Sequence, residues 1–348
     1  MYKNIIRPVL FLISPEMIHD VSVVVLLIAN KIPFFSSLMR RIFCVTDPIL
    51  EKKIGNIIFK NPVGLAAGFD KNAEFYKPLS NFGFGFIEIG TVTPKGQPGN
   101  PKPRVFRLKR DKALINRMGF NNAGAEQIIK NLVRRKAHDI IIGGNIGKNK
   151  ITSLENATED YLFCFEKLYP YVDYFAINVS SPNTPDLRKL QEKSRLEELF
   201  DSLIELNNTK SLQKPIFLKI APDLNDEQLK DIAELVNKKS GITGVIATNT
   251  TISRADLSYE KEYLESVGEG GLSGLPVRDI STAIITTLRR LLEQDKIIIG
   301  VGGIMSEHDA MEKLRAGADL LQLYTGFIYE GPSLITRINK AILKSKNH

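Results

Sequence analysis

The chain has 348 residues, of which 43% are hydrophobic and 25% charged, a globular balance that excludes a disordered or fibrous protein. Its 47 basic and 39 acidic side chains leave a formal charge of +8, which favours acidic ligands or an anionic membrane face but does not predict nucleic-acid binding. Only two cysteines, Cys44 and Cys164, are present, which excludes a disulfide scaffold and a cysteine-based zinc cluster, and we expect no resident metal.

The first 45 residues differ from the rest of the chain. Apolar residues recur at helical spacing over residues 5–13, and Ser14 followed by Pro15 predicts the N-cap and first position of a second helix. The apolar run at 21–29 is shorter than the roughly 20 residues of a membrane span, and the acidic residues before it argue against a signal peptide or presequence. Two interpretations remain, a hairpin packed on its own barrel or helices lying in a membrane interface.

Short apolar runs alternate with longer segments of helical periodicity from residue 61 onward. The runs predict eight strands, at residues 62–67, 85–90, 140–146, 174–179, 216–220, 244–248, 296–301 and 319–324. Helical segments between them include residues 126–136, 155–168, 194–207, 226–239, 279–292 and 307–316. This repetition predicts an α/β fold, a TIM (β/α)8 barrel over residues 46–348 with a small N-terminal helical extension at 1–45. A doubly wound sheet would give no reason for the number eight.

Polar and small residues follow nearly every predicted strand, where the active sites of such barrels are built. Gly302 and Gly303 follow the seventh strand, and Thr325 and Gly326 follow the eighth. Bare backbone amides at these two positions favour a phosphate site over simple tight turns.

Amides form a second group at the strand ends. Five asparagines suit a ligand rich in amide edges, such as a pyrimidine-like ring or a flavin; they are Asn116, Asn145, Asn178, Asn183 and Asn249. Lys219 ends an apolar strand and could form a Schiff base, place a charge beside a flavin's N1 and C2 carbonyl, or sit in a structural ion pair. Lys71 could accept a substrate carboxylate or be a solvated loop lysine.

Histidine is absent from the strand ends, since His138, His308 and His348 fall at helix ends or the terminus. A histidine base is therefore disfavoured, and the hydroxyls of Ser180 and Ser181 are left as proton acceptors. Serine is a poor base unless its surroundings help it, because its pKa lies far above 7.

The ordered motifs resemble those of the quinone-dependent, membrane-associated (class 2) dihydroorotate dehydrogenases, and the likeness runs essentially end to end. They lie at residues 61–71, 90–94, 115–122, 145–149, 178–185, 219–224, 247–251 and 270–274. The resemblance implies oxidation of (S)-dihydroorotate to orotate in de novo pyrimidine (UMP) biosynthesis, with FMN as cofactor and quinone as the final acceptor.

The resemblance also implies roles for individual residues. Ser181 would take the C5 proton while a hydride passes from C6 to FMN N5, and Thr184 and Phe120 would border the proton's exit path. The implied FMN site comprises Ala67, Gly68, Phe69, Asp70, Lys71, Thr91, Asn145, Asn178, Lys219, Thr248, Gly274, Gly303, Tyr324 and Thr325. The implied substrate site comprises Lys71, Asn116, Arg117, Met118, Gly119, Phe120, Asn178, Asn183, Asn249 and Thr250. His19, Arg107 and Tyr324 match positions at the quinone entrance.

Two features distinguish this class from the cytosolic one, which uses a cysteine base and lacks the helical extension. In this chain Ser181 stands at the position of the base, and residues 1–45 correspond to the helical extension. The resemblance therefore favours helices that dock on the cytoplasmic face of a cell (inner) membrane as a peripheral anchor and lead quinone to the flavin. Phe69, where leucine is commoner, and Thr325, where serine is, are small departures.

Two rival functions remain open from the residues themselves. One is a non-redox phosphate-binding barrel, an aldolase or isomerase that uses Lys219. The other is a non-catalytic, membrane-docked binding protein on a barrel scaffold.

Overall fold

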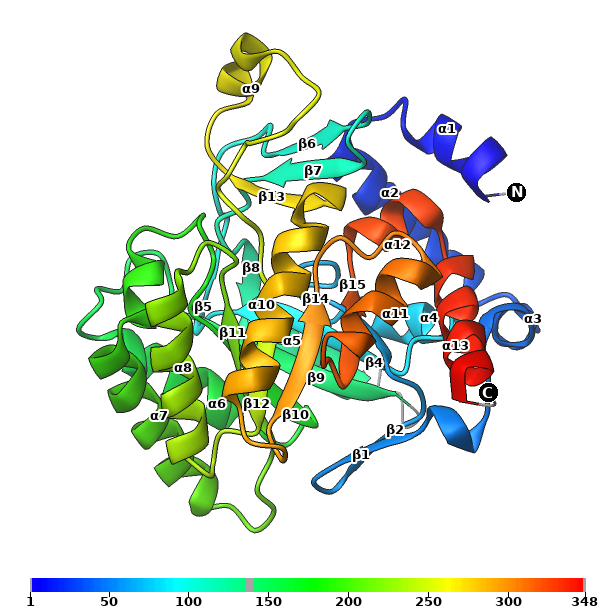
Figure 1. The fold of residues 1–348 in the computed structure, drawn as a ribbon. Helices are drawn as coiled ribbons and strands as arrows, with labels where there is room; N and C mark the ends of the chain where they lie inside the picture. Colours follow the sequence, from blue (N-terminus) through cyan, green and yellow to red (C-terminus); the bar gives the residue numbers. More distant parts are fainter. Residues whose placement is uncertain (1, 135–139, 347–348) are drawn as a thin grey trace.

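A closed barrel of eight parallel strands forms the centre of the protein (Figure 1). The computed structural model describes residues 2–134 and 140–346. The barrel strands, in chain order, are β3 (Val63–Leu65), β4 (Phe86–Val92), β9 (Ile141–Ile146), β10 (Tyr174–Asn178), β11 (Ile216–Ile220), β12 (Gly244–Ala247), β14 (Ile297–Val301) and β15 (Leu320–Leu323). The predicted TIM (β/α)8 barrel is confirmed, and every predicted strand is present within two residues at each end.

A helix follows each barrel strand and covers its outer face. These helices are α4 (Tyr76–Ser80), α5 (Ala125–Arg134), α6 (Ala157–Leu168), α7 (Lys193–Asn208), α8 (Asp226–Lys238), α10 (Arg278–Leu291), α11 (Glu307–Arg315) and α13 (Ser333–Lys346). The end of the helix predicted at 126–136 lies outside the described residues. Barrel strands are apolar along nearly their whole length because side chains are buried on both faces, which also explains their continuous apolar sequence pattern.

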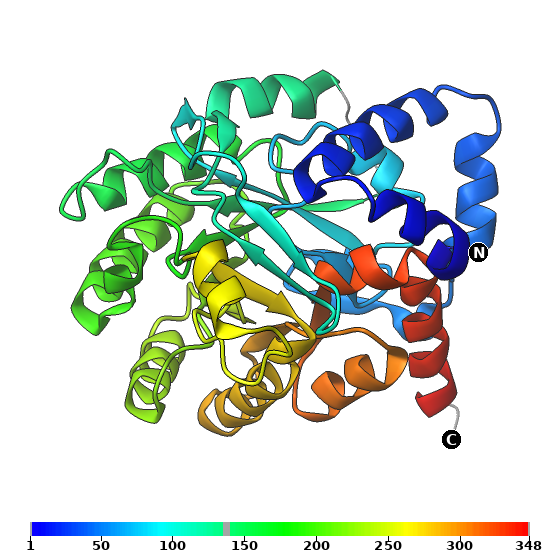
Figure 2. The same cartoon turned by 90° about the horizontal axis from the view of Figure 1, so that it is seen from above.

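Smaller elements lie at both ends of the barrel, and the sequence did not predict them. An antiparallel sheet of β6 (Val105–Leu108), β7 (Ala113–Asn116) and β13 (Gly271–Gly274) lies over the C-terminal mouth, next to α9 (Lys261–Val267) (Figure 2). A second pair, β5 (Lys95–Gln97) and β8 (Asn122–Gly124), also belongs to these loops. Strands of three or four residues carry too few side chains for a recognisable alternation.

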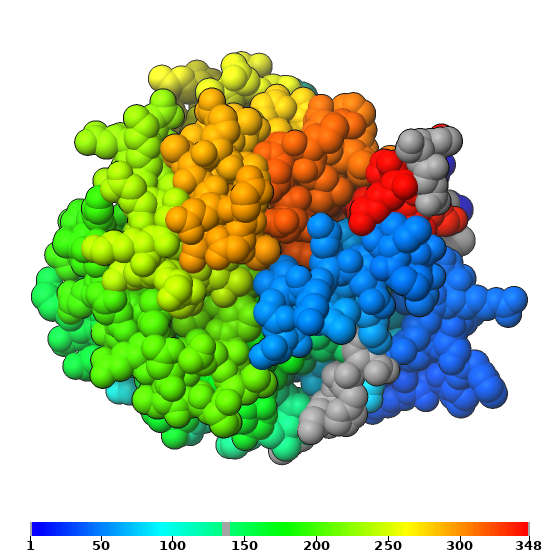
Figure 3. All heavy atoms as spheres, turned by 60° about the horizontal axis from the view of Figure 1, so that its bottom comes forward, coloured from blue at the N-terminus to red at the C-terminus, as the bar shows by residue number. Residues whose placement is uncertain are grey.

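The opposite end of the barrel is closed by the hairpin of β1 (Lys52–Ile54) and β2 (Ile57–Phe59). Phe59 packs edge-on against Phe86 inside the barrel, with ring centres 5.2 Å apart. Figure 3 brings this end forward and shows the blue atoms of the hairpin segment on the surface beside the orange helices. Ligands therefore have access to the barrel from the other end, where the strands terminate.

The N-terminal segment folds into η1 (Tyr2–Ile6), α1 (Arg7–Leu10), α2 (Pro15–Ala29) and α3 (Phe35–Phe43) beside the mouth (Figures 1 and 2). Ser14 precedes α2 as predicted, although its side chain makes no capping hydrogen bond. Among residues 2–134 and 140–346, no single helix is long and apolar enough to cross a membrane. Residues 2–10 and 15–29 meet the criterion only together, and they are bent by 116° at the break.

The remaining short helical turns lie in the loops between these elements. They are η2 (Pro48–Leu50), η3 (Leu187–Gln191), η4 (Leu275–Val277) and α12 (Thr325–Glu330). Of these, η4 and α12 border the mouth of the barrel because they directly follow β13 and β15.

Candidate active site

A cavity of about 1090 Å³, counted with its open mouth, lies at the C-terminal ends of the barrel strands. Most residues predicted for the two ligand sites line it. They are Ala67, Gly68, Lys71, Thr91, Asn116, Met118, Gly119, Phe120, Asn178, Ser181, Asn183, Lys219, Thr248, Asn249, Thr250, Gly274, Gly303, Tyr324 and Thr325. Residues that are up to 258 positions apart in the chain, from Ala67 to Thr325, thus meet in one pocket.

A buried carboxylate, that of Glu88 in β4, organises the floor of this cavity. It accepts hydrogen bonds from Lys219 Nζ at 3.1 Å, Asn145 Nδ2 at 2.8 Å, Gln322 Nε2 at 2.6 Å and Tyr174 Oη at 3.2 Å. Four donors satisfy the carboxylate, which a buried charge requires. Lys219 therefore sits in an ion pair, one of the three roles considered for it, while it also lines the cavity.

The glutamate also fixes the direction of the amides above it. Because Asn145 donates to Glu88, its Oδ1 faces the other way and accepts from Thr91 Oγ1 at 2.6 Å and Asn178 Nδ2 at 3.2 Å. Asn145 thus lies one layer beneath the cavity, whereas the other four predicted asparagines line it. Four of the five asparagines therefore line the cavity, and Asn145 affects it only by orienting Thr91 and Asn178.

Ser181 is buried in the wall of the cavity, in the loop that follows β10. Its Oγ accepts a hydrogen bond from the Asn183 backbone amide at 3.3 Å, which leaves the hydroxyl proton free to point elsewhere. Nearby in sequence, the buried Thr184 Oγ1 has no hydrogen-bond partner among residues 2–134 and 140–346. An unpaired buried hydroxyl is costly and calls for a partner that these residues do not supply.

Glycines form the end of the cavity bounded by β14 and β15. Gly303 has a left-handed backbone, with φ at +67°, and a Cβ there would lie 2.4 Å from Arg278 Cα. A Cβ on Gly326 would lie 1.9 Å from the Ile304 carbonyl oxygen. Only glycine fits either position, and Thr325 adds a hydroxyl that lies 2.8 Å from Ser273 Oγ. The glycines of both loops therefore border one cavity, and the phosphate site predicted for them stays a prediction.

Lys71 lies at the rim of the cavity in the loop after β3. Burial lowers the pKa of its ammonium to about 8, and the positive charge of Arg104 acts in the same direction. The carboxyl of Asp70 beside it accepts from the backbone amides of Glu74 and Phe75 at 2.8 and 2.9 Å. Asp70 therefore shapes the loop that presents Lys71, and burial raises the pKa of its carboxyl to about 6.

Aromatic rings connect the cavity to the N-terminal helices. Tyr324, whose ring lines the cavity, lies edge-on to Phe69 at 5.6 Å, and Phe69 lies edge-on to His19 of α2 at 5.2 Å. Burial lowers the pKa of His19 to about 4, helped by the charge of Lys71, so the imidazole is neutral near pH 7. An uninterrupted series of rings thus runs from α2 to the pocket.

Two arginines predicted for ligand binding are not among the residues that line the cavity. Arg117 donates to the backbone carbonyls of Val267 and Pro103, the latter at 3.0 Å, and lies over the Phe106 ring. Arg107 lies over the Phe11 ring, 4.5 Å from its centre, and donates to the Ile13 carbonyl. Both side chains secure neighbouring segments, and their predicted roles stay predictions.

Sequence reasoning missed the acceptor of the floor network, Glu88, and its partner Gln322. Both stand inside strands that are otherwise largely apolar. A charged or amide side chain inside a strand of this kind needs a buried partner, so the sequence could have indicated a buried network at Glu88, but not which side chains it meets.

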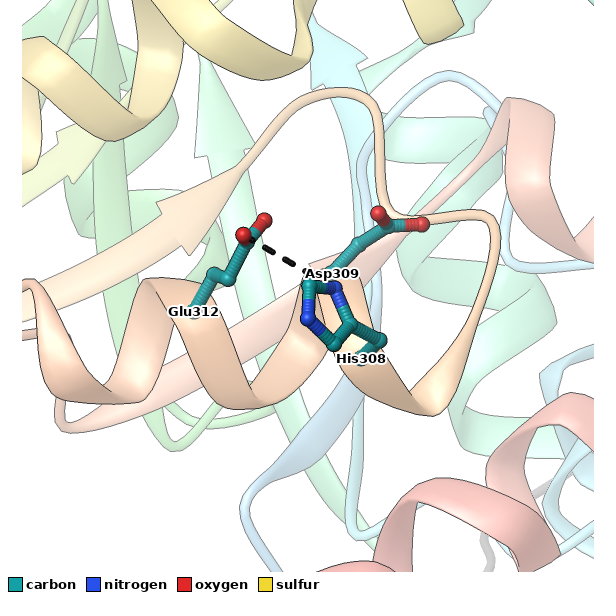
Figure 4. A group of neighbouring side chains, drawn as sticks. All are labelled: His308, Asp309 and Glu312. Carbon is teal, nitrogen blue, oxygen red and sulfur yellow. Dashed lines mark ion pairs between the residues drawn. The ribbon is translucent and has the colours of Figure 1, made fainter.

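One further group of potential metal ligands lies on α11, at His308, Asp309 and Glu312 (Figure 4). His308 and Glu312 form an ion pair across one turn, with Nδ1 and Oε1 3.7 Å apart. Asp309 instead accepts from Met305 N and Ser306 Oγ, both at 2.9 Å, at the start of the helix. The three side chains lie close together because Asp309 caps the start of α11 while His308 and Glu312 pair on its surface.

Known proteins provide an independent comparison. The family model described as dihydroorotate dehydrogenase matches residues 49–345. A protein of Christiangramia forsetii named dihydroorotate dehydrogenase (quinone) is 55% identical over 344 residues, which cover 99% of each chain. A protein of the same name from Idiomarina loihiensis is 48% identical and covers 96% of this chain and 98% of its own. Ligand-free DHODH from Eimeria tenella is structurally similar, with a TM-score of 0.85, 36% identity, and coverage of 96% of this chain and 95% of that one.

Proposed function

The chain belongs to the dihydroorotate dehydrogenase family, and we propose on that premise that it oxidises dihydroorotate to orotate and passes the electrons to a quinone. One observation supports the proposed reaction itself. The residues matched by motif to a substrate site, a base and a phosphate site converge from the ends of different strands on one cavity. Orotate is the product of this redox step in pyrimidine synthesis.

FMN fits the cavity as the cofactor. Gln322 Oε1 is buried, borders the cavity and has no hydrogen-bond partner in the described parts of the chain, so it offers an acceptor to a ligand. Lys219 offers a donor to a ligand in the same cavity, and Gly303 lines the cavity with backbone that could contact a phosphate. When bound, FMN would supply the hydride acceptor that none of the side chains can provide.

Ser181 is the base that removes the C5 proton in this proposal. Its position in the cavity wall brings a hydroxyl to the substrate, and the backbone amide of Asn183 orients that hydroxyl. The unpaired hydroxyl of Thr184 would relay the proton outward along a path that Phe120 borders, which answers the objection that serine alone is a weak base.

Amides and one lysine recognise the substrate ring. Lys71 supplies a positive charge for the carboxylate, and Asn116, Asn178, Asn183 and Asn249 line the same cavity with donors and acceptors for the ring's amide edges. Asn183 Nδ2 donates to Asn116 Oδ1 at 3.1 Å, so these two amides orient one another before a ligand binds. Such preorganisation reduces the cost of ordering side chains on binding.

The N-terminal helices would dock on the cytoplasmic face of the cell membrane and admit quinone. Support comes from the apolar side chains that they leave exposed, which are Ile5, Ile6, Val9, Leu12, Ile13, Met17, Val21, Val24, Val25, Ile28, Ile32, Phe34, Leu38 and Ile42. Exposed apolar surface on amphipathic helices is typical of interfacial anchors. His19, Phe69 and Tyr324 form a ring-lined route between these helices and the cavity, which suits an apolar electron acceptor.

The rival functions draw no support from this geometry. An aldolase-type Schiff base needs a neutral amine, whereas Lys219 lies beside the Glu88 carboxylate. A binding protein without activity would hold flavin or orotate without turnover, which the assays below would detect.

A visible absorption spectrum tests the proposal. The purified protein should be yellow, with bands near about 370 and 450 nm, and should bleach under anaerobic dihydroorotate. Turnover with decylubiquinone and not with fumarate would then support the quinone acceptor. A colourless protein that cannot be reconstituted with FMN would overturn the redox function, and borohydride trapping of a substrate on Lys219 would favour the aldolase.

A further inference from the structure

A lysine outside the cavity, Lys313 in α11, is completely buried. Its Nζ donates to the Arg278 carbonyl at 3.3 Å, Ser281 Oγ at 3.0 Å and Thr282 Oγ1 at 3.1 Å. An ammonium has three protons and no acceptor, so all three are used, and all three partners lie in the first turn and a half of α10. The lysine therefore binds the start of one barrel helix to the body of the next.

The hydrogen bonds of Lys313 continue through Ser281 to Val301, which lines the cavity. Because Lys313 can only donate, Ser281 Oγ must accept from it, and the single proton of that hydroxyl goes to the Val301 carbonyl at 2.5 Å. Val301 is the last residue of β14 and is followed directly by Gly302 and Gly303. A chain of two hydrogen bonds thus joins Lys313 to the residue before the glycine turn.

The start of α10 and the glycine turn are also in van der Waals contact. A Cβ on Gly303 would lie 2.5 Å from Arg278 N and 2.4 Å from its Cα, and a Cβ on Gly302 would lie 3.0 Å from Ser281 Cβ. The first turn of α10 is therefore the surface on which the glycine turn rests. Any movement of that helix start would change where the amides of residues 302 and 303 point.

We propose that Lys313 is a positioning residue that holds the glycine turn in the shape that binds the FMN phosphate. The inference rests on the proposed function, because it concerns how that cofactor is retained. The lysine would act through Ser281 and Arg278 and not by contact with the phosphate. It would also place a buried positive charge behind the turn, where it favours an anion.

Charged neighbours are compatible with this role. Burial lowers the pKa of Lys313 to about 8, against the opposing charges of Asp309 and Asp279, so the side chain remains mostly protonated near pH 7. Asp309 does not neutralise it through a direct bond, since that carboxylate is engaged by Met305 and Ser306.

A second buried lysine provides a matched control. Lys296 stands at the start of β14, at the opposite end of the barrel from the cavity, and its Nζ donates to the carbonyls of Lys239 and Ile242 at 3.2 and 2.9 Å. Its loss removes a buried ammonium of the same kind without touching the glycine turn.

The test compares the release of two flavins that differ only in the phosphate. Wild type, Lys313→Met and Lys296→Met would be loaded with FMN or, by exchange against excess, with riboflavin. Release after dilution would be followed by the rise in free-flavin fluorescence. We expect Lys313→Met to speed FMN release roughly tenfold, the value of one lost hydrogen bond to a charged group, and to leave riboflavin release within about twofold of wild type. Lys296→Met should leave the ratio of the two rates unchanged.

Equal acceleration of both flavins, or no acceleration, would overturn the proposal and leave Lys313 as a structural lysine. If Lys313→Met yields no folded holoprotein, Ser281→Ala breaks the same chain at its middle and is judged by the same two rates. Wild type that binds no FMN would instead overturn the proposed function, which keeps the two failures distinct.

Discussion

The mouth of the barrel buries polar side chains, whereas the N-terminal segment exposes apolar ones. In the mouth, polar side chains are buried and hydrogen-bonded in series, from Glu88 through Asn145 and Asn178 to Ser180. In the N-terminal segment, apolar side chains face outward on the helices, as with Val24, and in the turns between them, where Leu12 is 83% and Phe34 87% exposed. A pocket lined with polar side chains suits a small polar substrate, and an uncovered apolar surface suits lipid and quinone.

The two regions also differ in how firmly they are held. Network hydrogen bonds tie the mouth to the barrel strands, whereas a few tethers hold the helices, among them the ion pair of Glu16 with Arg104 at 2.7 Å and the hydrogen bond from Arg40 to Asn81 at 2.8 Å. Changes in one region should therefore be separable from the chemistry of the other. Four experiments use this separation.

The largest effect is expected in the mouth, from Ser181→Ala. Removal of the proposed base should slow flavin reduction by dihydroorotate by about 10² to 10⁴-fold, measured as bleaching in anaerobic stopped flow. Reoxidation of chemically reduced enzyme by quinone should continue at the wild-type rate, because it needs no base at this position. Flavin reduction at an unchanged rate would remove Ser181 from the mechanism.

The next effect concerns the exposed face of α2. Val24 and Ile28 are one helical turn apart and both exposed, and each apolar side chain buried in lipid should contribute about 1.5–3 kcal/mol. Val24→Glu combined with Ile28→Glu should therefore abolish cosedimentation with lipid vesicles and leave flavin reduction intact. Ile151→Glu, at an 85% exposed residue of the barrel, is the control. Equal binding of all three proteins would mean that this face does not meet the membrane.

A smaller effect is expected from the pH dependence of substrate-site binding. Lys71 is charged below its pKa of about 8 and neutral above it, so its attraction for a carboxylate is lost as pH rises through that value. The Kd of orotate should rise about tenfold per pH unit above about 8. Lys71→Arg, which stays protonated, should remove this dependence. A wild-type Kd that is flat between pH 7 and 10 would exclude Lys71 as the carboxylate partner.

The smallest effect is expected at the tether. Burial would raise the pKa of Glu16, but hydrogen bonds and charges from Arg104 and Lys102 outweigh it and lower the value. This stabilising contribution is present above the ordinary pKa of glutamate and is lost as pH falls through the lowered one. Glu16→Gln should weaken docking of α2 by about 1 kcal/mol, seen as faster proteolysis of residues 1–45 at pH 7.

An exposed ion pair supplies the comparison for that experiment. Glu234→Gln breaks the pair with Lys193 on the barrel surface, where both side chains are solvated, and should leave proteolysis unchanged. Equal rates for Glu16→Gln and wild type would show that the apolar contacts alone hold α2.

Prediction from the sequence succeeded where the signal is local. Strands such as residues 216–220 are short apolar runs, and the polar residues that follow them identify the mouth without any knowledge of pairing. It failed for β6, β7 and β13, which are too short to show a period, and β7 pairs with β13 across more than 150 residues, as Asn116 does with Gly271. The ligand-binding role predicted for Arg117 stays a prediction, since in the structure its guanidinium donates to the carbonyls of Val267 and Pro103.

The sequence by itself determined the eight-fold alternation of strand and helix, the chemistry of the strand ends and the apolar character of the first 45 residues, because each follows from the periodicity of neighbouring side chains. Only the tertiary structure decided that Glu88 pairs with Lys219, that α2 reaches Phe69, and that α10 supports the glycine turn. Barrel closure brings such distant groups together, and the direction of their hydrogen bonds follows from which donors and acceptors then meet.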